Sequence, residues 1–193
     1  KGLIMLLHGA PGVGKTCTAE CVAAKHGRPL FPITCGDLGT TPTEVETNLD
    51  FNFQLAESWG CVLLLDEADV FLAEKRRKDV NQNALVSVFL CALEYYRGIL
   101  FLTTNRVGTI DEAFRSRIHL TLYYPPLDMD KTEAIWKHHL NRLDLHERKP
   151  VSGDRDDILE YAKQLFNRQS TVDKVVWNGR QIRNAFQTAV ALA

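Results

Sequence analysis

The chain has 193 residues, of which 45% are hydrophobic and 24% are charged, values typical of a soluble globular protein with one sizeable core or with one large and one small domain. Its formal net charge of −1 gives no overall basic field that would favour nucleic acid or an anionic membrane. The longest apolar runs, such as CVLLL, are far too short to cross a bilayer, so we expect no membrane contact from this segment.

No secretory signal or transit peptide is visible in the sequence. The chain begins with Lys1, and its first apolar run follows almost at once. We therefore expect a fragment of a longer intracellular protein, and the sequence leaves the compartment open. The five cysteines form no Cys-x-x-Cys pair, which favours free thiols in a reducing compartment over a zinc site.

Short apolar runs alternate with segments of helical period along the first half of the chain. A buried strand is predicted over 3–8, a helix over 15–26 and a second strand over 29–35. The proline inside this second strand favours a place near the edge of a sheet. The next helix is predicted to begin at Thr41, which can form a capping box with Glu44.

The middle of the chain continues the same alternation. Residues 61–66, CVLLLD, form a continuous apolar strand, as expected where both faces of a sheet are covered. A helix over 80–96 and strands over 98–105 and 118–124 follow. This order predicts an α/β fold with a five-stranded parallel sheet between two layers of helices.

The pattern changes at the proline pair 125–126. Beyond it the sequence shows only helical periods, over about 128–143, 154–167 and 178–192. Asp154 and Asn178 are suitable N-caps for the last two of these helices. We therefore expect two domains, an α/β core over 1–126 and a small all-helical domain over 127–193.

A glycine-rich loop separates the first predicted strand from the first helix. It matches G-x-x-x-x-G-K-[ST] in full, with the residues Gly9, Ala10, Pro11, Gly12, Val13, Gly14, Lys15 and Thr16. Its backbone N–H groups can surround phosphate oxygens, Lys15 can reach the β- and γ-phosphates, and Thr16 can offer a hydroxyl to Mg²⁺. A glycine-rich turn with a surface lysine is the alternative, but the strand-to-helix context speaks against it.

An acidic pair follows the third predicted strand, at the sheet edge where ligands of parallel sheets bind. Asp66 can hold Mg²⁺ opposite Thr16, mostly through water, and Glu67 can polarise the water that attacks a γ-phosphate. Taken alone, this pair could equally be an acidic turn. The phosphate loop upstream is what favours the catalytic interpretation.

In combination, GAPGVGKT, LLLDEAD, LFLTTN and DEAFRSRI resemble an AAA+ ATPase module, and the likeness extends over essentially the whole chain. The stretch from VFLCALEYY to YYPPL is similar to a fungal type of AAA domain. The resemblance implies a P-loop NTPase core with a helical lid, ATP and Mg²⁺ as ligands, and ATP hydrolysis.

The resemblance also assigns roles to polar residues outside the loop. Asn105 would be sensor 1, whose amide contacts the γ-phosphate or orients water; a turn residue is the alternative. Arg180 would be a sensor-2 arginine that approaches the phosphates from the lid, with a solvated arginine as the alternative.

In proteins of this kind the ATP lies at a subunit interface, and arginines that follow sensor 1 enter the neighbour's site. Arg115 and Arg117 match that place and would stabilise charge that develops on the transferred phosphoryl group. An internal ion pair with Asp111 or Glu112 is the alternative.

The resemblance implies a homo-oligomeric ring, expected to be a hexamer, that remodels a macromolecule. Near-neutral charge favours a protein substrate or an attached domain over nucleic acid. The segment CGDLGTTPTEV has no aromatic residue at its tip, where protein-threading rings usually carry one, and the basic run at 75–78 is expected to be a solvated loop. A non-hydrolysing nucleotide-dependent scaffold or switch, and a nucleic-acid motor or loader, remain as alternative functions.

Overall fold

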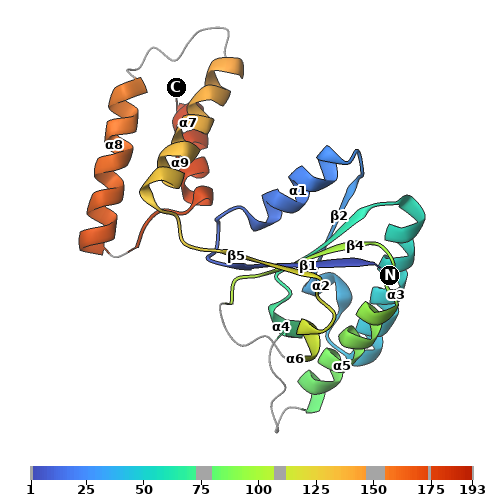
Figure 1. Ribbon diagram of the computed structural model, residues 1–193. Helices are drawn as coiled ribbons and strands as arrows, with labels where there is room; N and C mark the ends of the chain where they lie inside the picture. Colours follow the sequence, from blue (N-terminus) through green and yellow to red (C-terminus); the bar gives the residue numbers. More distant parts are fainter. Residues whose placement is uncertain (1, 73–79, 107–111, 147–154, 174, 193) are drawn as a thin grey trace. The chain divides into compact units, whose positions relative to one another are not determined.

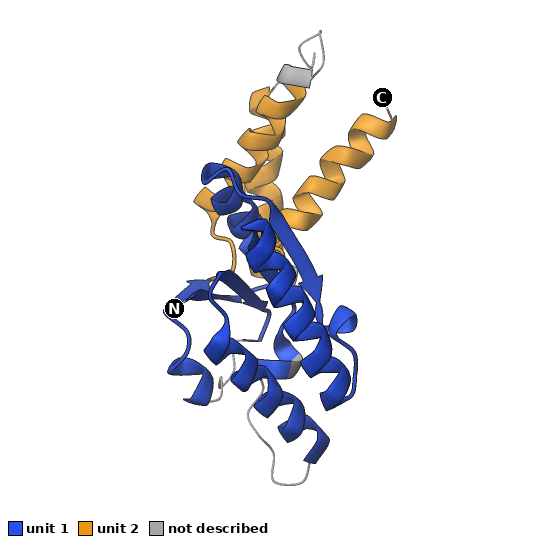
Figure 2. Ribbon diagram, turned by 90° about the vertical axis from the view of Figure 1, so that its right-hand side faces the viewer, with its two compact units in different colours: residues 1–10, 14–124 blue, residues 11–13, 125–193 orange. Residues whose placement is uncertain are grey.

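The structure, a computed structural model, describes residues 2–72, 80–106, 112–146, 155–173 and 175–192 (Figure 1). The basic run at 75–78, Asp111 and the predicted cap Asp154 lie outside these residues. The chain divides into two compact units, which Figure 2 shows in separate colours: residues 1–10 with 14–124, and residues 11–13 with 125–193.

The first unit is built from a sheet and the helices that connect its strands. In chain order these are β1 (Leu3–Gly9), α1 (Lys15–Lys25), β2 (Leu30–Thr34), α2 (Cys35–Leu38), α3 (Pro42–Trp59), β3 (Val62–Asp66), α4 (Asp69–Leu72), α5 (Val80–Tyr95), β4 (Ile99–Thr104), α6 (Glu112–Arg115) and β5 (Leu120–Tyr124). The strands lie in the order β2-β3-β4-β1-β5, and every neighbouring pair is parallel. The predicted five-stranded parallel sheet is confirmed, with the proline-containing β2 at its edge.

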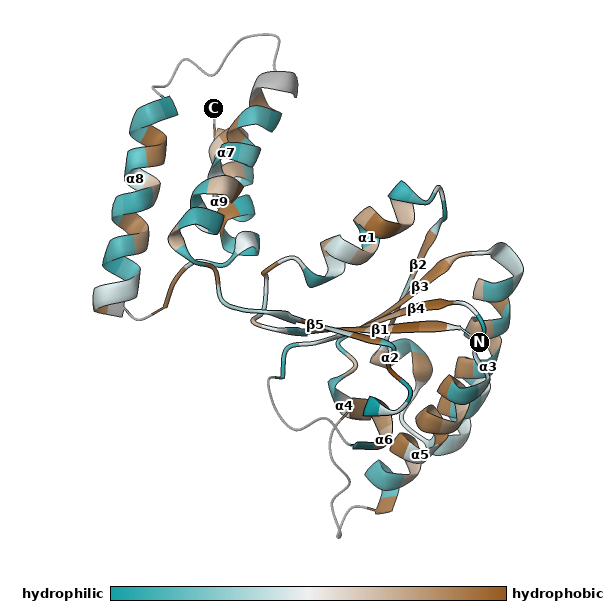
Figure 3. Cartoon of the chain, in the orientation of Figure 1, coloured by the Kyte–Doolittle hydropathy of each residue, from teal (hydrophilic) through white to brown (hydrophobic). Residues whose placement is uncertain are grey.

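Alternate residues of the strands enter two separate cores, one on each face of the sheet. In β3, Leu63 and Leu65 belong to a large cluster with residues of α3 and α5. Val62 and Leu64 belong to a smaller cluster with Ala19 of α1. Figure 3 shows β1, β3 and β4 as mostly apolar, with α1 on one side of the sheet and α3 and α5 on the other. This three-layer arrangement explains why β3, which is buried on both faces, is continuously apolar as far as Asp66.

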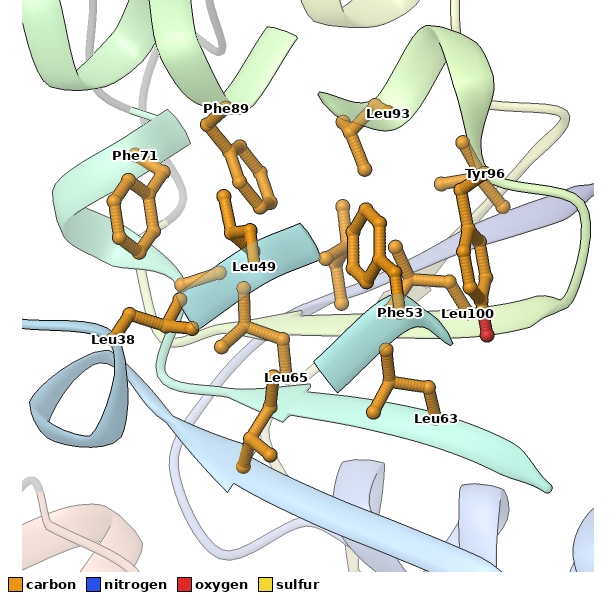
Figure 4. Packing of buried hydrophobic residues seen from close by; sticks show 14 of the residues in the cluster. Leu38, Leu49, Phe53, Leu63, Leu65, Phe71, Phe89, Leu93, Tyr96 and Leu100 are labelled. Carbon is orange, nitrogen blue, oxygen red and sulfur yellow. The ribbon is translucent and has the colours of Figure 1, made fainter. Parts of the chain in front are cut away.

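Aromatic rings form the centre of the larger core (Figure 4). Phe89 of α5 is fully buried; its ring centroid lies 4.7 Å from that of Phe71 and 5.8 Å from that of Phe114. The ring of Tyr96 packs against Phe53 at 4.4 Å, and burial raises the pKa of its phenol well above the usual value. The helices on this face are therefore anchored by ring-to-ring packing.

The predicted capping box at the start of α3 is present. The Thr41 hydroxyl accepts the N–H of Glu44 at 3.3 Å, and the Glu44 carboxylate accepts the N–H of Thr41 at 3.1 Å. The N–H of Thr40, which donates to the same carboxylate at 3.0 Å, and the N–H of Thr41 hold the pKa of the Glu44 carboxyl below its usual range, because both stabilise the charged form. Pro42 occupies the first turn of α3, where its missing N–H leaves no hydrogen bond unmade.

The second unit is helical in its described residues from 125 onward. It contains α7 (Met129–His146), α8 (Arg155–Arg168), a short π-helix η1 (Gln169–Asp173) and α9 (Gly179–Leu192). Its core is formed by Trp136, Ala162 and Ile182, one from each long helix. The predicted cap at Asn178 is confirmed, because its Oδ1 accepts the N–H of Gln181 at 3.0 Å.

Three residues of the glycine-rich loop group with this helical unit. The N–H of Gly179 donates to the carbonyl oxygen of Gly12 at 2.8 Å. Gly12 has a φ of 70°, and a Cβ there would lie 2.6 Å from the Asn178 side chain. A side chain at position 12 would therefore be strained twice, by backbone conformation and by contact.

None of the described helices is long and apolar enough to cross a membrane.

Candidate functional site

The polar residues predicted for the site lie where parallel strands end. The strands β1, β3 and β4 end at Gly9, Asp66 and Thr104, along one edge of the sheet. Because side chains alternate along a strand, Asp66 follows Leu64 onto the face that α1 covers. The first turn of α1 carries the end of the glycine-rich loop to the same edge.

Lys15 connects the loop to the end of β4. Its side chain is only 7% exposed, and its Nζ donates to the carbonyl oxygens of Gly9 at 3.0 Å and Ala10 at 2.7 Å. The same Nζ donates to the Asn105 amide oxygen at 2.8 Å. The structure therefore brings together the loop lysine and the predicted sensor, which are 90 residues apart in sequence.

Two glycines set the path of the loop in the first unit. Gly9 has a φ of 134°, and a Cβ there would lie 2.0 Å from the carbonyl oxygen of Tyr124. Gly14 has a φ of 103° and begins α1 as its N-cap. Only glycine adopts these conformations without strain, so the loop can turn its N–H groups toward an anion at the helix N-terminus.

A hydroxyl and a carboxylate suited to Mg²⁺ lie side by side. The Thr16 Oγ1 lies 3.4 and 3.3 Å from the two carboxylate oxygens of Asp66. Adjacent ligands of an octahedral Mg²⁺ with bonds near 2.1 Å are separated by about 3 Å, so this oxygen pair fits the ion. Within the described ranges no group of three or more His, Cys, Asp or Glu residues could hold a metal.

Glu67 has an unusual backbone conformation. Its φ is 56°, the left-handed region, and within the described ranges no other residue except glycine has a positive φ. Its side chain is exposed, whereas that of Asp66 is partly buried. The two neighbouring carboxylates therefore have different surroundings. The Asp66 carboxylate lies beside the Thr16 hydroxyl, and the Glu67 carboxylate is exposed to solvent.

The sequence analysis missed two residues that hold this acidic pair. The Thr103 hydroxyl accepts the N–H of Glu67 at 3.0 Å and donates to the Asp66 carboxylate. The Cys35 thiol donates to the carbonyl oxygen of Glu67 at 3.1 Å. A hydroxyl in the otherwise apolar run ILFLTT was a usable signal for Thr103, whereas no sequence signal pointed to Cys35.

The two predicted arginine fingers have different surroundings. Arg117 forms an ion pair with Glu94 of α5 at 3.1 Å and donates to the carbonyl oxygen of Ala113 at 3.1 Å. Its partner among the described residues is Glu94, on another helix, whereas Asp111 lies outside the described residues. Arg115 is exposed at the last position of α6. Arg180 is exposed in the first turn of α9, in the helical unit.

One histidine lies next to the loop. His8 precedes Gly9 in β1, and its ring packs against Tyr123 at a centroid distance of 5.2 Å. Burial, and to a smaller extent the charge of Lys15, lowers the pKa of His8. The imidazole is therefore neutral at pH 7 and adds no positive charge to the lysine beside it.

A parallel α/β sheet with a glycine-rich loop at its edge defines a P-loop nucleoside triphosphatase. Residues 5–126 match the family described as ATPase family associated with various cellular activities (AAA), and residues 127–193 match the fungal AAA+ ATPase lid domain. The chain belongs to the AAA family of ATPases and is an ATP-hydrolysing module.

Individual relatives agree with this family. The chain is 33% identical over 174 residues to cell division control protein 48 homolog B of Arabidopsis thaliana, covering 83% of this chain and 28% of that protein. It is 27% identical over 193 residues to human ATPase family AAA domain-containing protein 3B, covering 97% of this chain and 29% of that protein. The chain thus spans less than a third of either relative.

A solved structure supports the fold. The FIGL-1 AAA domain, crystallised in complex with ADP, matches with a TM-score of 0.67 at 24% identity, over 93% of this chain and 57% of that one. This likeness concerns the fold alone.

Proposed function

We propose that this chain is the motor module of a ring-forming protein, expected to be a hexamer, which hydrolyses Mg-ATP at subunit interfaces to remodel a macromolecular substrate. The observation that carries the proposal is the meeting of Lys15 and Asn105 at 2.8 Å, with Thr16 and Asp66 at 3.3 Å, on one edge of the sheet. A protein substrate or an attached domain is favoured over nucleic acid because the net charge is −1.

The loop and its neighbours would hold the nucleotide. The backbone N–H groups of the loop, which Pro11 lacks, would surround the phosphates, and the Lys15 ammonium would donate to phosphate oxygens in place of its carbonyl partners. Thr16 and Asp66 hold Mg²⁺, directly or through water. When bound, Mg-ATP supplies the phosphoanhydride bond and a cation that neutralises the phosphate charge.

Glu67 and Asn105 act on the attacking water. The exposed Glu67 carboxylate accepts a proton from that water, and the Asn105 amide orients it toward the γ-phosphate. Hydrolysis then needs no covalent bond to the protein, because positioning and charge stabilisation account for the rate.

The neighbouring subunit would complete the site. Arg115 is the first candidate for the finger because it is exposed, and Arg117 is the second because its guanidinium already pairs with Glu94. A guanidinium in this role contributes roughly 10³–10⁵ in rate. We also propose that residues 127–193 form the lid, from which Arg180 approaches the phosphates.

The replacement of Glu67 by Gln tests the proposal. Glu67→Gln should bind Mg-ATP with unchanged affinity, measured by calorimetry, and lose at least about 100-fold in the rate of phosphate release, because the amide cannot take up a proton. Glu46→Gln, at an exposed position of α3, is the matched control and should retain the wild-type rate.

Other results would favour the alternative functions. Tight Mg-ATP binding by the assembled wild-type protein without any phosphate release would indicate a nucleotide-dependent scaffold or switch. Strong stimulation of phosphate release by DNA or RNA would indicate a nucleic-acid motor or loader. A Glu67→Gln variant with the wild-type rate would refute the assignment of the base.

A further inference from the structure

The backbone of Glu67 needs support from its surroundings. A residue with a side chain in the left-handed region is strained by contact between Cβ and its own backbone, and such strain persists only where neighbouring groups enforce it. Glu67, with a φ of 56°, directly follows β3 and precedes α4, so neither element imposes its regular conformation on it. The enforcing contacts come from β4 and α2.

Thr103 of β4 provides most of these contacts. Its side chain, 2% exposed, places a single hydroxyl between the two acidic residues: it accepts the N–H of Glu67 at 3.0 Å and donates to the Asp66 carboxylate. Its backbone carbonyl accepts the N–H of Ala68 at 2.8 Å. Because the hydroxyl has one proton, donation to Asp66 leaves its lone pairs directed at Glu67, and both bonds form together.

Cys35 provides the remaining contact. Its half-buried thiol donates to the carbonyl oxygen of Glu67 at 3.1 Å, from the first residue of α2. Both polar groups of the Glu67 backbone are therefore held by side chains, one from each strand that neighbours β3: the N–H by β4 and the carbonyl by the residue that follows β2. A thiol is a weak donor, so we expect the Thr103 bonds to dominate.

We propose that Thr103 is a positioning residue for hydrolysis, whose hydroxyl fixes the carboxylate of Asp66 and the strained backbone of Glu67 relative to each other, with Cys35 as an auxiliary donor. The inference rests on the proposed role of Glu67 as the base. The exposed Glu67 side chain extends from this left-handed backbone, and the loss of the backbone's support would let the carboxylate move. A shift of about 1 Å in a catalytic group can reduce the rate by about 10²-fold.

A purely structural role for Thr103 makes a different prediction. A hydroxyl that only ties β3 to β4 would lower the melting temperature when removed and leave kcat of the folded protein unchanged. A positioning hydroxyl lowers kcat in a protein that still folds and still binds nucleotide. The two roles are therefore separated by kcat measured beside nucleotide affinity.

The experiment compares Thr103→Val, which keeps the shape but removes the hydroxyl, with Thr103→Ser, which keeps the hydroxyl. Thr121→Val, on an exposed position of β5, is the matched control. Thr103→Val should reduce kcat by about 10- to 100-fold while the Kd for Mg-ATP changes less than about threefold. Thr103→Ser should restore kcat to within about threefold of the wild type, and the control should match the wild type.

A folded Thr103→Val protein with wild-type kcat overturns the inference, and so does a folded Thr103→Ser protein as slow as Thr103→Val. If circular dichroism shows that Thr103→Val does not fold, Thr103→Ala, which also removes the hydroxyl, replaces it: a decrease in kcat at constant Kd supports the inference, and an unchanged kcat overturns it. Glu67→Gln, measured in the same series, separates the two proposals. If that variant hydrolyses ATP at the wild-type rate, the base assignment fails; if only Thr103→Val does, the positioning role fails.

Discussion

Lys15 is the residue that links the loop to the strand ends. Its ammonium group is nearly buried and contacts two loop carbonyls and the Asn105 amide, so these contacts fix its position between the loop and the end of β4. A preoriented cation loses little conformational entropy when an anion binds. The chemistry of the site therefore depends on a side chain that the fold has already placed.

We expect Lys15→Ala to weaken Mg-ATP binding by at least about 100-fold, because a buried charge-assisted contact to phosphate is lost. Calorimetry measures this affinity directly. Lys25→Ala, at the exposed last residue of α1, should bind like the wild type. Equal affinities in both variants would exclude the loop as the phosphate site.

His8 is expected to make the stability of the first unit depend on pH. Its pKa is lowered in the folded state, so between about pH 7 and pH 5 the unfolded chain takes up a proton that the folded chain does not, and stability decreases as the pH falls. His8→Gln should lessen this decrease in denaturant midpoints over the same range. His26→Gln, at an exposed position just after α1, should keep the wild-type slope. Parallel slopes for His8→Gln and the wild type would contradict the assignment.

Sequence reasoning placed the residues of the loop and the acidic pair because their order along the chain carries the signal. It did not find Thr103 or Cys35, because their contacts depend on which strands lie beside β3. The order of the strands within the sheet cannot be read from the sequence. It also did not name Glu94 as a partner of Arg117, because Glu94 lies on another helix, 23 residues away. Motifs that are continuous in the sequence therefore predicted the loop and the acidic pair, whereas the contacts between distant elements depend on tertiary packing.

At the scale of elements, the strands and long helices were predictable because their apolar runs and caps agree with one another. The capping box at Thr41 and the N-cap at Asn178 were visible in the sequence and are present. The π-helix η1 was not predictable, because its polar sequence QSTVD has no periodic signal of its own. Its conformation depends on the helices to which it is joined.

The aromatic packing of α5 makes the larger core sensitive to truncation. Phe89→Ala should destabilise the first unit by about 3–5 kcal/mol, because the fully buried ring leaves a cavity beside Phe71 and Phe114. Chemical denaturation measures the change. Phe51→Ala, on an α3 side chain that is 62% exposed, should cost less than about 1 kcal/mol. Comparable losses at both positions would mean that the ring cluster does not anchor α5.

At the scale of the whole molecule, the proposal that a neighbouring subunit supplies the arginine fingers can be tested by mixing variants. Subunits with Arg115→Ala and Arg117→Ala keep an intact loop, and Lys15→Ala subunits keep intact fingers. Each variant alone should be nearly inactive, whereas a mixture should regain part of the phosphate-release activity at the interfaces where an intact loop meets intact fingers. A mixture no more active than its components would argue against fingers supplied by a neighbour.

The hydrogen bond between Gly12 and Gly179 has an optical consequence. Trp177 lies two residues before Gly179, its side chain packs against the core of the helical unit, and its backbone N–H donates to the Gln169 side chain at 2.9 Å. The exposed Trp59 belongs to the other unit, and Trp59→Phe leaves Trp177 and the core residue Trp136 as the emitters. The protein thus carries an intrinsic fluorophore two residues from the glycine that is hydrogen-bonded to Gly12, and its emission can report a change at this bond without any added dye.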